Sequence, residues 1–371
     1  MTLYAHITGW GIAVPDKILT NDDIAKMMDT SDEWIRERTG IQERRIAGPQ
    51  DSTSSLASAA AIRALEMANI SPWDVELIIV TTSSPEYIFP ATASLVQDRI
   101  GAANAGALDI LAACTGFIYA LDMVTQTIRS GAFKTALVIG AETLSRFLDW
   151  TDRDTCILFG DGAGAFVLQA SEEPGGVISS VLRSDGSGGE LLSIPAGGSA
   201  QPASARTVQD GLHFIHMNGR EVYRFATKVM ARSSEETLSK ANWDIKDISL
   251  IIPHQANKRI INAAARGLKL PIEKFAINVH KYGNTSTASI PIATVEAFEE
   301  GRLNRNDKIV FVGFGSGLSW GALSVIWTGP FPIEKAVPFK RLRFLARLIS
   351  WYRRLVRKLD GLIWGRKGNS A

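Results

Sequence analysis

The chain has 371 residues, of which 46% are hydrophobic and 21% charged, a composition typical of a globular protein with a large core. Its net charge of +2 is unevenly distributed, because residues 335–371 carry eleven Lys and Arg against one Asp and leave residues 1–334 at −8. We see no signal-peptide pattern, no run of the roughly 18 apolar residues of a membrane-spanning helix, and no disulfide framework. We therefore expect a cytoplasmic protein without a metal or other cofactor.

Short apolar runs and helical patterns succeed one another along the first 330 residues. The runs are β-branched and do not alternate with polar residues, which is typical of strands that helices cover on both faces. They are VELIIV (75–80), GALDILAA (106–113), TALVIG (135–140), ISLIIP (248–253), FAINVH (275–280) and KIVFVGFG (308–315). Helical patterns cover Ser52–Met67, Gly116–Ser130 and Gly219–Lys240. This order predicts an α/β fold.

The sequence also repeats itself at a constant offset of 173 residues, which indicates a duplicated fold. The matching pairs are Ala68-Asn69 with Ala241-Asn242, Asp74 with Asp247, and Leu77–Ile79 with Leu250–Ile252. We expect two similar α/β halves, 1–180 and 181–329, followed by a tail, 330–371.

Cys114 lies where the run GALDILAA ends and the helical pattern beginning at Gly116 starts. A nucleophile at a sharp strand-to-helix turn is exposed to substrate, and the helix N-terminus favours its thiolate. Its own backbone N–H can also stabilise a developing oxyanion. Taken alone, the residue fits a small buried core thiol slightly better. The glycines of GDGAGA (160–165) lead into the run AFVLQA rather than a helix, so they do not predict a nucleotide site.

His254 and Asn284 follow apolar runs of the second half. His254 comes directly after ISLIIP and opens the loop HQANKR, and the carboxyl end of a buried strand is where open α/β sheets hold functional groups. Asn284 follows FAINVH and precedes an apolar helical pattern, so it occupies the second half's counterpart of the Cys114 turn. A helix cap is the common role of such an asparagine, and capping does not prevent it from donating to a substrate.

With these three residues in place, the chain resembles the β-ketoacyl-acyl carrier protein synthase III family of thiolase-like condensing enzymes. The resemblance runs from about Ile7 to Trp327 and rests on six motifs in order: TSDEWIRERTGI (30–41), CTGF (114–117), TDRDT with LFGDGAGA (151–165), PHQAN (253–257), YGNTS (282–286) and GFGSGLSWGA (313–322). It implies a layered α-β-α-β-α core, a homodimer, and initiation of fatty acid synthesis from an acyl-CoA primer and malonyl-acyl carrier protein.

The resemblance also implies a role for each matching residue. Cys114 would carry the acyl group as a thioester, while His254 and Asn284 would hold the malonyl thioester carbonyl as carbon dioxide leaves. The backbone N–H groups of Cys114 and Ser316 would form the oxyanion hole, although the family usually has glycine at the second position. Further implied contacts are Phe314 and Phe89 at the active-site wall, with Phe89 crossing the dimer; Trp34, Arg38 and Arg153 for CoA; and Arg224, Gln255, Ala256, Asn257, Lys258 and Arg259 for the carrier protein.

Other functions are compatible with parts of the same pattern. A related acyltransferase or ketosynthase of specialised, polyketide-like metabolism would share the fold and the cysteine. A degradative thiolase is disfavoured, because the loop GFGSGLSWG lacks the second catalytic cysteine expected there. A non-enzymatic scaffold that recruits membranes or partners has no need of a complete Cys-His-Asn set.

The tail lies beyond the resemblance and carries a second pattern. After Pro338, apolar residues recur at spacings of three and four while Lys and Arg fill most of the other positions; the stripe is Leu342, Leu345, Ile349, Tyr352, Val356, Leu359 and Ile363. A coiled-coil seam and docking of this stripe on the body are both possible readings. The broad apolar face, the cationic face and Trp351 and Trp364 favour peripheral contact of residues 338–367 with an anionic membrane. We do not expect nucleic acid binding, because no stacking platform accompanies the charge.

Overall fold

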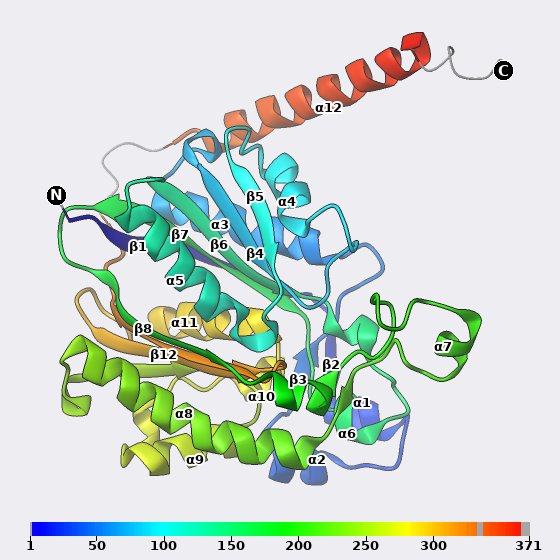
Figure 1. The fold of residues 1–371 in the computed structure, drawn as a ribbon, viewed down its shortest axis with the longest axis vertical. Coiled ribbons are helices and arrows are strands. Elements are labelled where there is room, and N and C mark those ends of the chain that lie inside the picture. Colours follow the sequence, from blue (N-terminus) through cyan, green and yellow to red (C-terminus); the bar gives the residue numbers. More distant parts are fainter. Residues whose placement is uncertain (1, 332–336, 365–371) are drawn as a thin grey trace.

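The computed structural model describes residues 2–331 and 337–364, which form a layered body and one outlying helix (Figure 1). A five-stranded sheet has the order β1-β7-β6-β4-β5, and a four-stranded sheet has the order β11-β12-β13-β8. Their strands are β1 (Tyr4–Ala13), β4 (Leu77–Thr81), β5 (Gly106–Ile110), β6 (Thr135–Glu142), β7 (Gly162–Ser171), β8 (Gly176–Ser184), β11 (Leu250–Pro253), β12 (Lys308–Gly315) and β13 (Ser319–Ile326). Two-stranded sheets are formed by β2 (Ile18–Thr20) with β3 (Glu43–Arg45), and by β9 (Leu192–Ser193) with β10 (His216–Met217).

Helices cover both sheets on both faces and so produce the expected α-β-α-β-α arrangement. Helices α3 and α4 pack on the outer face of the first sheet, α5 and α11 lie between the sheets, and α8 with α9 covers the second sheet. The long helices are α3 (Thr53–Ala68), α4 (Thr92–Ile100), α5 (Gly116–Arg129), α8 (Gly219–Ala241), α9 (Lys258–Leu268), α11 (Ser289–Glu299) and α12 (Phe339–Trp364). The shorter ones are α1 (Asn21–Ala25), α2 (Asp32–Thr39), α6 (Arg153–Cys156), α7 (Ala205–Gln209) and α10 (Val279–Tyr282).

The predicted duplication is present element by element. The offset of 173 residues relates β4 to β11, β6 to β12, and the 3-10 turn η1 (Pro72–Asp74) to η5 (Ile245–Asp247). It also relates η2 (Ala113–Thr115) to η7 (Ser286–Ala288). The two helix-ending asparagines, Asn69 and Asn242, both adopt left-handed backbone with φ of 56° and 54°. Strand β8 crosses the boundary expected at residue 180 and pairs in the second sheet.

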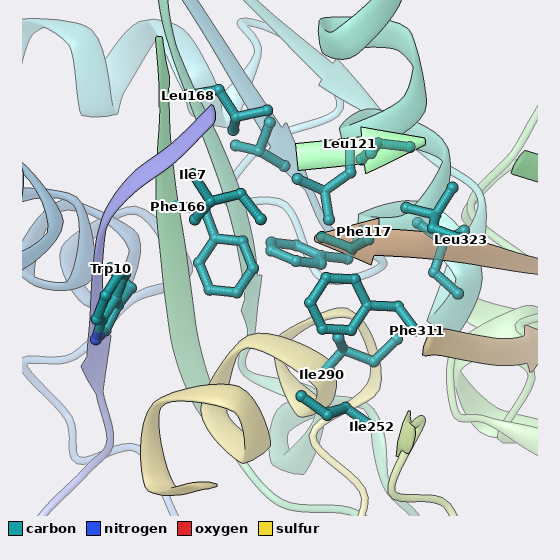
Figure 2. Close-up of a cluster of buried hydrophobic side chains, with 14 of the residues drawn as sticks. Ile7, Trp10, Phe117, Leu121, Phe166, Leu168, Ile252, Ile290, Phe311 and Leu323 are labelled. Carbon is teal, nitrogen blue, oxygen red and sulfur yellow. The ribbon is translucent and has the colours of Figure 1, made fainter. Parts of the chain in front are cut away.

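The two halves share one hydrophobic core between the sheets (Figure 2). Phe117 of α5 packs edge-on against Phe166 of β7 at a ring distance of 5.1 Å, and Phe166 lies 6.2 Å from Phe311 of β12. All three side chains are fully buried. Each aromatic side chain of this size removes a large apolar area from water, so this cluster fixes the sheets against each other.

Two expected strands differ in the structure. FAINVH contributes only one bridge, between Phe275 and Ile251, and its end forms helix α10 instead. The backbone N–H groups of Asn278 and Val279 donate to the Gln255 side chain, which replaces the hydrogen bonds of a strand partner. Strand β5 is an edge strand that leaves Leu108 exposed, rather than a strand buried on both faces.

Helix α12 confirms the helical pattern of the tail but not its possible docking through the apolar stripe. It contacts the body at α4, where the small side chain of Ala346 is buried beside Gly101 and Ser350 Oγ donates to Asp98 at 2.7 Å. Most of its large apolar side chains are exposed instead, whereas Phe339, Leu342 and Val356 are half-buried. The described helices include none with the length and apolar character needed to cross a bilayer.

Candidate active site

Cys114 occupies the sharp turn that the sequence predicts. It sits in η2, between the end of β5 and the start of α5. The preceding Ala113 has a φ of +44°, a strained conformation for a residue with a Cβ and one typical of functional turns. The end of β12 approaches so closely that a Cβ added to Gly315 would lie 2.8 Å from the Cys114 backbone nitrogen. Glycine is therefore required where the second half meets the nucleophile.

The protonation state of Cys114 differs from the expectation of a stabilised thiolate. Burial raises the pKa of its thiol to about 12, a hydrogen bond with Ser286 opposes this rise, and the nearby carboxyl of Glu142 adds to it. Cys114 is only 6% exposed, so the loss of hydration of a thiolate outweighs the favourable effect of the helix N-terminus. Cys114 is accordingly a neutral thiol at pH 7. Cys156 lies in a separate buried cluster and has the position of a core residue.

His254 follows β11 and is buried as a neutral imidazole. Burial lowers its pKa to about 3. Its Nδ1 lies 2.6 Å from Ser289 Oγ, and that same hydroxyl oxygen accepts from the backbone N–H of Gln255 at 3.4 Å. The Ser289 hydroxyl can therefore donate to Nδ1, which places the imidazole proton on Nε2. Phe314 packs edge-on against the ring at 5.4 Å and fixes its plane.

Asn284 lies just before η7, whose N-cap is Thr285, so it does not have the cap position that the sequence suggested. Its Oδ1 accepts the backbone N–H of Ser286 at 2.8 Å, a local turn that holds the side chain. This bond leaves the Nδ2 amide as the group that can donate to a substrate. His254 and Asn284 thus offer neutral donors, one from the connection between β11 and α9 and one from the connection between α10 and η7.

Cys114 lies at the junction of two cavities. The first, of about 1010 Å³, is lined by Cys114, His254, Asn284 and Phe314, and it extends to Trp34 and Arg38 at the surface. The second, of about 670 Å³, is mainly apolar; its lining includes Ile88, Leu111, Leu144, Phe159, Ile194 and Ile215. A group bound to Cys114 therefore has an apolar chamber on one side and the polar pair on the other.

Glu142, at the end of β6, is a buried carboxyl that the sequence patterns did not reveal. Its carboxyl accepts Ser84 Oγ at 2.6 Å and the backbone N–H of Ser83 at 3.1 Å, and lies 3.1 Å from Thr287 Oγ1. Burial raises its pKa, and the hydrogen bonds from Ser84 and Ser83 oppose that rise. The sequence did offer one indication of this residue, because the apolar run of β6 ends in Glu142. Ser289 was also missed, although it ends the polar segment YGNTSTAS.

The expected CoA contacts meet at the rim of the first cavity. The guanidinium groups of Arg38 and Arg153 lie 4.3 Å and 4.6 Å from the Trp34 ring centroid. Arg153 also donates to Asp29 O at 3.1 Å. At these distances no ring fits between Trp34 and Arg153, so an adenine could enter that slot only after Arg153 moves.

The expected carrier-protein residues divide into surface and internal groups. Arg224 and Lys258 are exposed, as is Arg259, which lies over the Tyr223 ring and lines the first cavity. Ala256 and Asn257 are half-buried, and Asn257 donates to Arg38 O at 3.0 Å. The expected contact of Gln255 with the carrier protein is wrong, because its side chain is buried. It donates to Pro253 O and Ala276 O and accepts from the backbone at the start of α10, so it stabilises the loop around His254.

The remaining expected residues have distinct positions. Ser316 lines the second cavity, and its hydroxyl donates to Leu192 O, away from Cys114. Phe89 does not line the cavities of its own chain; it stands 83% exposed on the loop that also carries Tyr87 and Ile88. Within the described ranges, no group of three or more His, Cys, Asp or Glu could hold a metal ion.

Comparisons with known proteins point to one family. The model of 3-oxoacyl-[acyl-carrier-protein (ACP)] synthase III matches residues 108–186, and the model of its C-terminal part matches residues 238–327. Beta-ketoacyl-[acyl-carrier-protein] synthase III of Roseiflexus sp. (strain RS-1) is 48% identical over 88% of this chain and 100% of its own length. The protein of the same name from Desulfitobacterium hafniense (strain DSM 10664 / DCB-2) is 52% identical over 87% and 97%, respectively.

Solved structures agree with these relatives. The crystal structure of 3-oxoacyl-[acyl-carrier-protein] synthase III from Aquifex aeolicus VF5 has a TM-score of 0.81 at 46% identity, covering 87% of this chain and 99% of that one. The priming β-ketosynthase from the R1128 polyketide biosynthetic pathway also has a TM-score of 0.81, at 31% identity, covering 88% and 97%.

The neutral state of His254 is testable by NMR of imidazole nitrogens. Because burial lowers its pKa to about 3, the His254 signals should not titrate between pH 5 and 8 and should show the proton on Nε2. Ser289→Ala removes the donor to Nδ1 and should populate the other tautomer. Ser324→Ala, which removes an equally buried hydroxyl on β13, should leave the spectrum unchanged. A titration near pH 6.5 would contradict this assignment.

The raised pKa of Cys114 predicts how the thiol reacts with iodoacetamide. Only the thiolate reacts, so with a pKa of about 12 the rate should be slow at pH 7 and rise about tenfold per pH unit, without a plateau below pH 9.5. Cys114→Ser supplies the background from Cys156. A rate that is already constant above pH 8 would mean that the helix N-terminus outweighs burial.

Proposed function

This chain belongs to the 3-oxoacyl-[acyl-carrier-protein] synthase III family, and we propose that it extends an acyl-CoA primer with malonyl-acyl carrier protein through an acyl thioester on Cys114. It is a condensing acyltransferase that starts fatty acid synthesis. The observation that carries the assignment of residues is the shared cavity: Cys114, His254 and Asn284 line one chamber, and Cys114 alone of the three also lines the apolar one.

The first half-reaction is an exchange of thioesters. The sulfur of Cys114 attacks the acyl-CoA carbonyl, the bond from that carbon to the CoA sulfur breaks, and the proton lost by Cys114 balances the one gained by CoA. The backbone N–H groups of Cys114 and Ser316 stabilise the oxyanion. The acyl chain then occupies the apolar cavity beside Leu111 and Ile194.

The second half-reaction forms the carbon–carbon bond. His254 Nε2–H and Asn284 Nδ2–H donate to the thioester carbonyl of malonyl-acyl carrier protein. When carbon dioxide leaves, the electron pair of the broken carbon–carbon bond stays on the α-carbon and forms an enolate with the thioester carbonyl. The two donors stabilise this enolate. The α-carbon of the enolate attacks the acyl carbonyl on Cys114, and the bond from that carbonyl carbon to the Cys114 sulfur breaks. The thiolate that leaves then takes up a proton from solvent. The product is a 3-oxoacyl-acyl carrier protein.

The outer residues suit the two thioester carriers. Trp34 and Arg38 at the cavity rim offer a stacking surface and a charge for the adenine and phosphates of CoA, with Arg153 swinging aside. Arg259 lines the same cavity, and Arg224 and Lys258 are exposed on α8 and α9, two of the helices that contribute to its lining. Positive side chains in these places suit an acidic carrier protein.

A homodimer would complete the apolar cavity. Among the described residues, no strand pairs with the outer edge of β5, and Leu108, Leu111, Ile88 and Phe89 are exposed beside it. An exposed edge strand with large apolar neighbours is suited to pairing with another copy. In that arrangement Phe89 reaches the cavity of the other subunit.

A second candidate is initiation of a polyketide-like pathway. It is favoured by the likeness to a priming β-ketosynthase at 31% identity. The same residues would carry the same two steps, and the difference would lie in the primer and in the carrier protein that accepts it.

The central test is intact-protein mass spectrometry after mixing the chain with a panel of acyl-CoAs. One acyl group should add to the parent chain and none to Cys114→Ala, and the best-loaded acyl group identifies the primer. If no acyl-CoA loads, acyl-carrier protein donors are tried next. Failure of both would refute the covalent intermediate.

The roles of the donor pair separate the two half-reactions. His254→Ala and Asn284→Ala should still load Cys114 but release carbon dioxide from malonyl-acyl carrier protein about 100- to 1,000-fold more slowly, the usual loss for one preorganised donor. Full decarboxylation by either variant would remove that residue from the mechanism.

The CoA contacts predict a split between binding and turnover. Trp34→Ala and Arg38→Ala should each raise KM for acyl-CoA about fivefold with little change in kcat, because stacking and charge contacts at an exposed rim contribute about 1 kcal/mol each. Arg36→Ala is the matched control, since Arg36 lies on the same helix but pairs with Asp32. Equal effects of Arg36→Ala and Arg38→Ala would contradict the CoA assignment.

A further inference from the structure

Helix α12 is held against the body by its small and polar side. Ala346, Ser350 and Arg354 follow one another at intervals of four residues and therefore share one face. Ala346 is buried beside Gly101, Ser350 donates to Asp98 at 2.7 Å, and Arg354 forms an ion pair with the same carboxylate. These contacts attach the helix to the C-terminal end of α4.

The opposite side of α12 is apolar and faces away from the body. It exposes Phe344 (63%), Leu348 (46%), Tyr352 (61%), Leu355 (39%) and Leu359 (47%), and Trp351 (62%) stands at its margin, where it also borders a cavity against the body. An amphipathic helix of a globular protein normally turns its apolar stripe toward the core, so the orientation here is reversed. Figure 1 shows α12 projecting past the elements beneath it, with that stretch uncovered by any other described segment. Contiguous apolar side chains of this kind mark a contact surface.

The charge of the helix indicates what covers that surface. Residues 339–364 contain eight Lys and Arg and one acid, Asp360, whereas residues 1–334 carry −8. A cavity of about 600 Å³ lies between α3, α4 and α12, beside the apolar stripe. Its charged lining residues are Arg63, Arg99, Arg347, Arg354, Glu66 and Asp98, and Trp351 lines it as well. A second copy would bring an identical cationic helix to the stripe and would be repelled. An anionic surface with an apolar interior matches both features.

We infer that α12 binds the surface of an anionic lipid bilayer. Its outward stripe inserts at the boundary between headgroups and acyl chains, and the flanking arginines contact lipid phosphates. The attachment at Asp98 keeps the polar side on the protein, so lipid contacts the stripe without unfolding any part of the body. Because α12 rests on residues that precede β5, whereas Cys114 follows the carboxyl end of that strand, the helix lies at the opposite end of the sheet from Cys114. The inference does not depend on the reaction at Cys114.

The test is sedimentation of the full chain with vesicles of phosphatidylcholine alone or mixed with phosphatidylglycerol. The parent chain should bind the mixed vesicles, with high salt weakening the binding, and should leave phosphatidylcholine vesicles unbound. Leu348→Ser with Trp351→Ser should lower the bound fraction at least about tenfold, because two inserted side chains are lost. Met27→Ser with Val208→Ser, which removes two apolar side chains of similar exposure elsewhere, should bind as the parent does.

Three outcomes would overturn the inference. These are equal binding to both vesicle types, undiminished binding of the Leu348/Trp351 variant, and binding to neither vesicle type together with self-association that this variant abolishes. The last result would assign the stripe to a second copy. Acyl loading of Cys114, followed in the same samples, should be unchanged in every variant, so a failure of vesicle binding is distinguishable from a failure of the proposed chemistry.

Discussion

A single buried carboxyl joins the parts of the active site that come from different halves. Glu142 ends β6, accepts hydrogen bonds from the loop after β4, and lies 3.1 Å from Thr287 of η7 in the second half. The Thr287 hydroxyl has one proton but also lies 2.9 Å from Thr81 O, which can only accept. The Thr287 hydroxyl therefore lies between two acceptors, Glu142 at the end of β6 and Thr81 O at the end of β4, and links η7 of the second half to both strands of the first.

The duplicated fold explains why this junction lies where it does. The 173-residue offset relates the strained Ala113 to Ser286, with φ of 44° and 46°, and relates Cys114 to Thr287. Both halves therefore build the same turn, and the two turns face each other across the interface. In the first the residue at the apex carries a reactive sulfur, whereas in the second it is engaged in the Glu142 network. Duplication followed by different use of one position has thus produced a nucleophile and its support from the same backbone.

Local patterns predicted the parts of the fold that local forces determine. Helices α3, α5 and α8 begin and end within a residue or two of the expected positions, because their periodicity and capping residues are read from neighbours in sequence. FAINVH failed because a side chain from a distant loop, Gln255, satisfies its backbone. The same residue shows that a motif does not tell which of its side chains reach the surface, because in PHQAN the Gln255 side chain is buried whereas Ala256 and Asn257 are half-buried. Ser289 and Glu142 act through contacts across 35 and 145 residues of sequence, which no local pattern records.

Burial also decides how charge is handled at the site. It raises the pKa of Cys114 and lowers that of His254, so both shifts oppose a resting thiolate–imidazolium pair. A neutral pair suits both half-reactions. In the first, the proton leaving the Cys114 thiol equals the proton that the departing CoA thiol requires, so the exchange needs no stored charge. In the second, His254 Nε2–H and Asn284 Nδ2–H donate to the enolate oxygen. These neutral donors stabilise it without a buried positive charge, whose desolvation would cost free energy before the reaction starts. The low dielectric that makes a thiolate or an imidazolium costly at this site strengthens these same hydrogen bonds once the enolate forms.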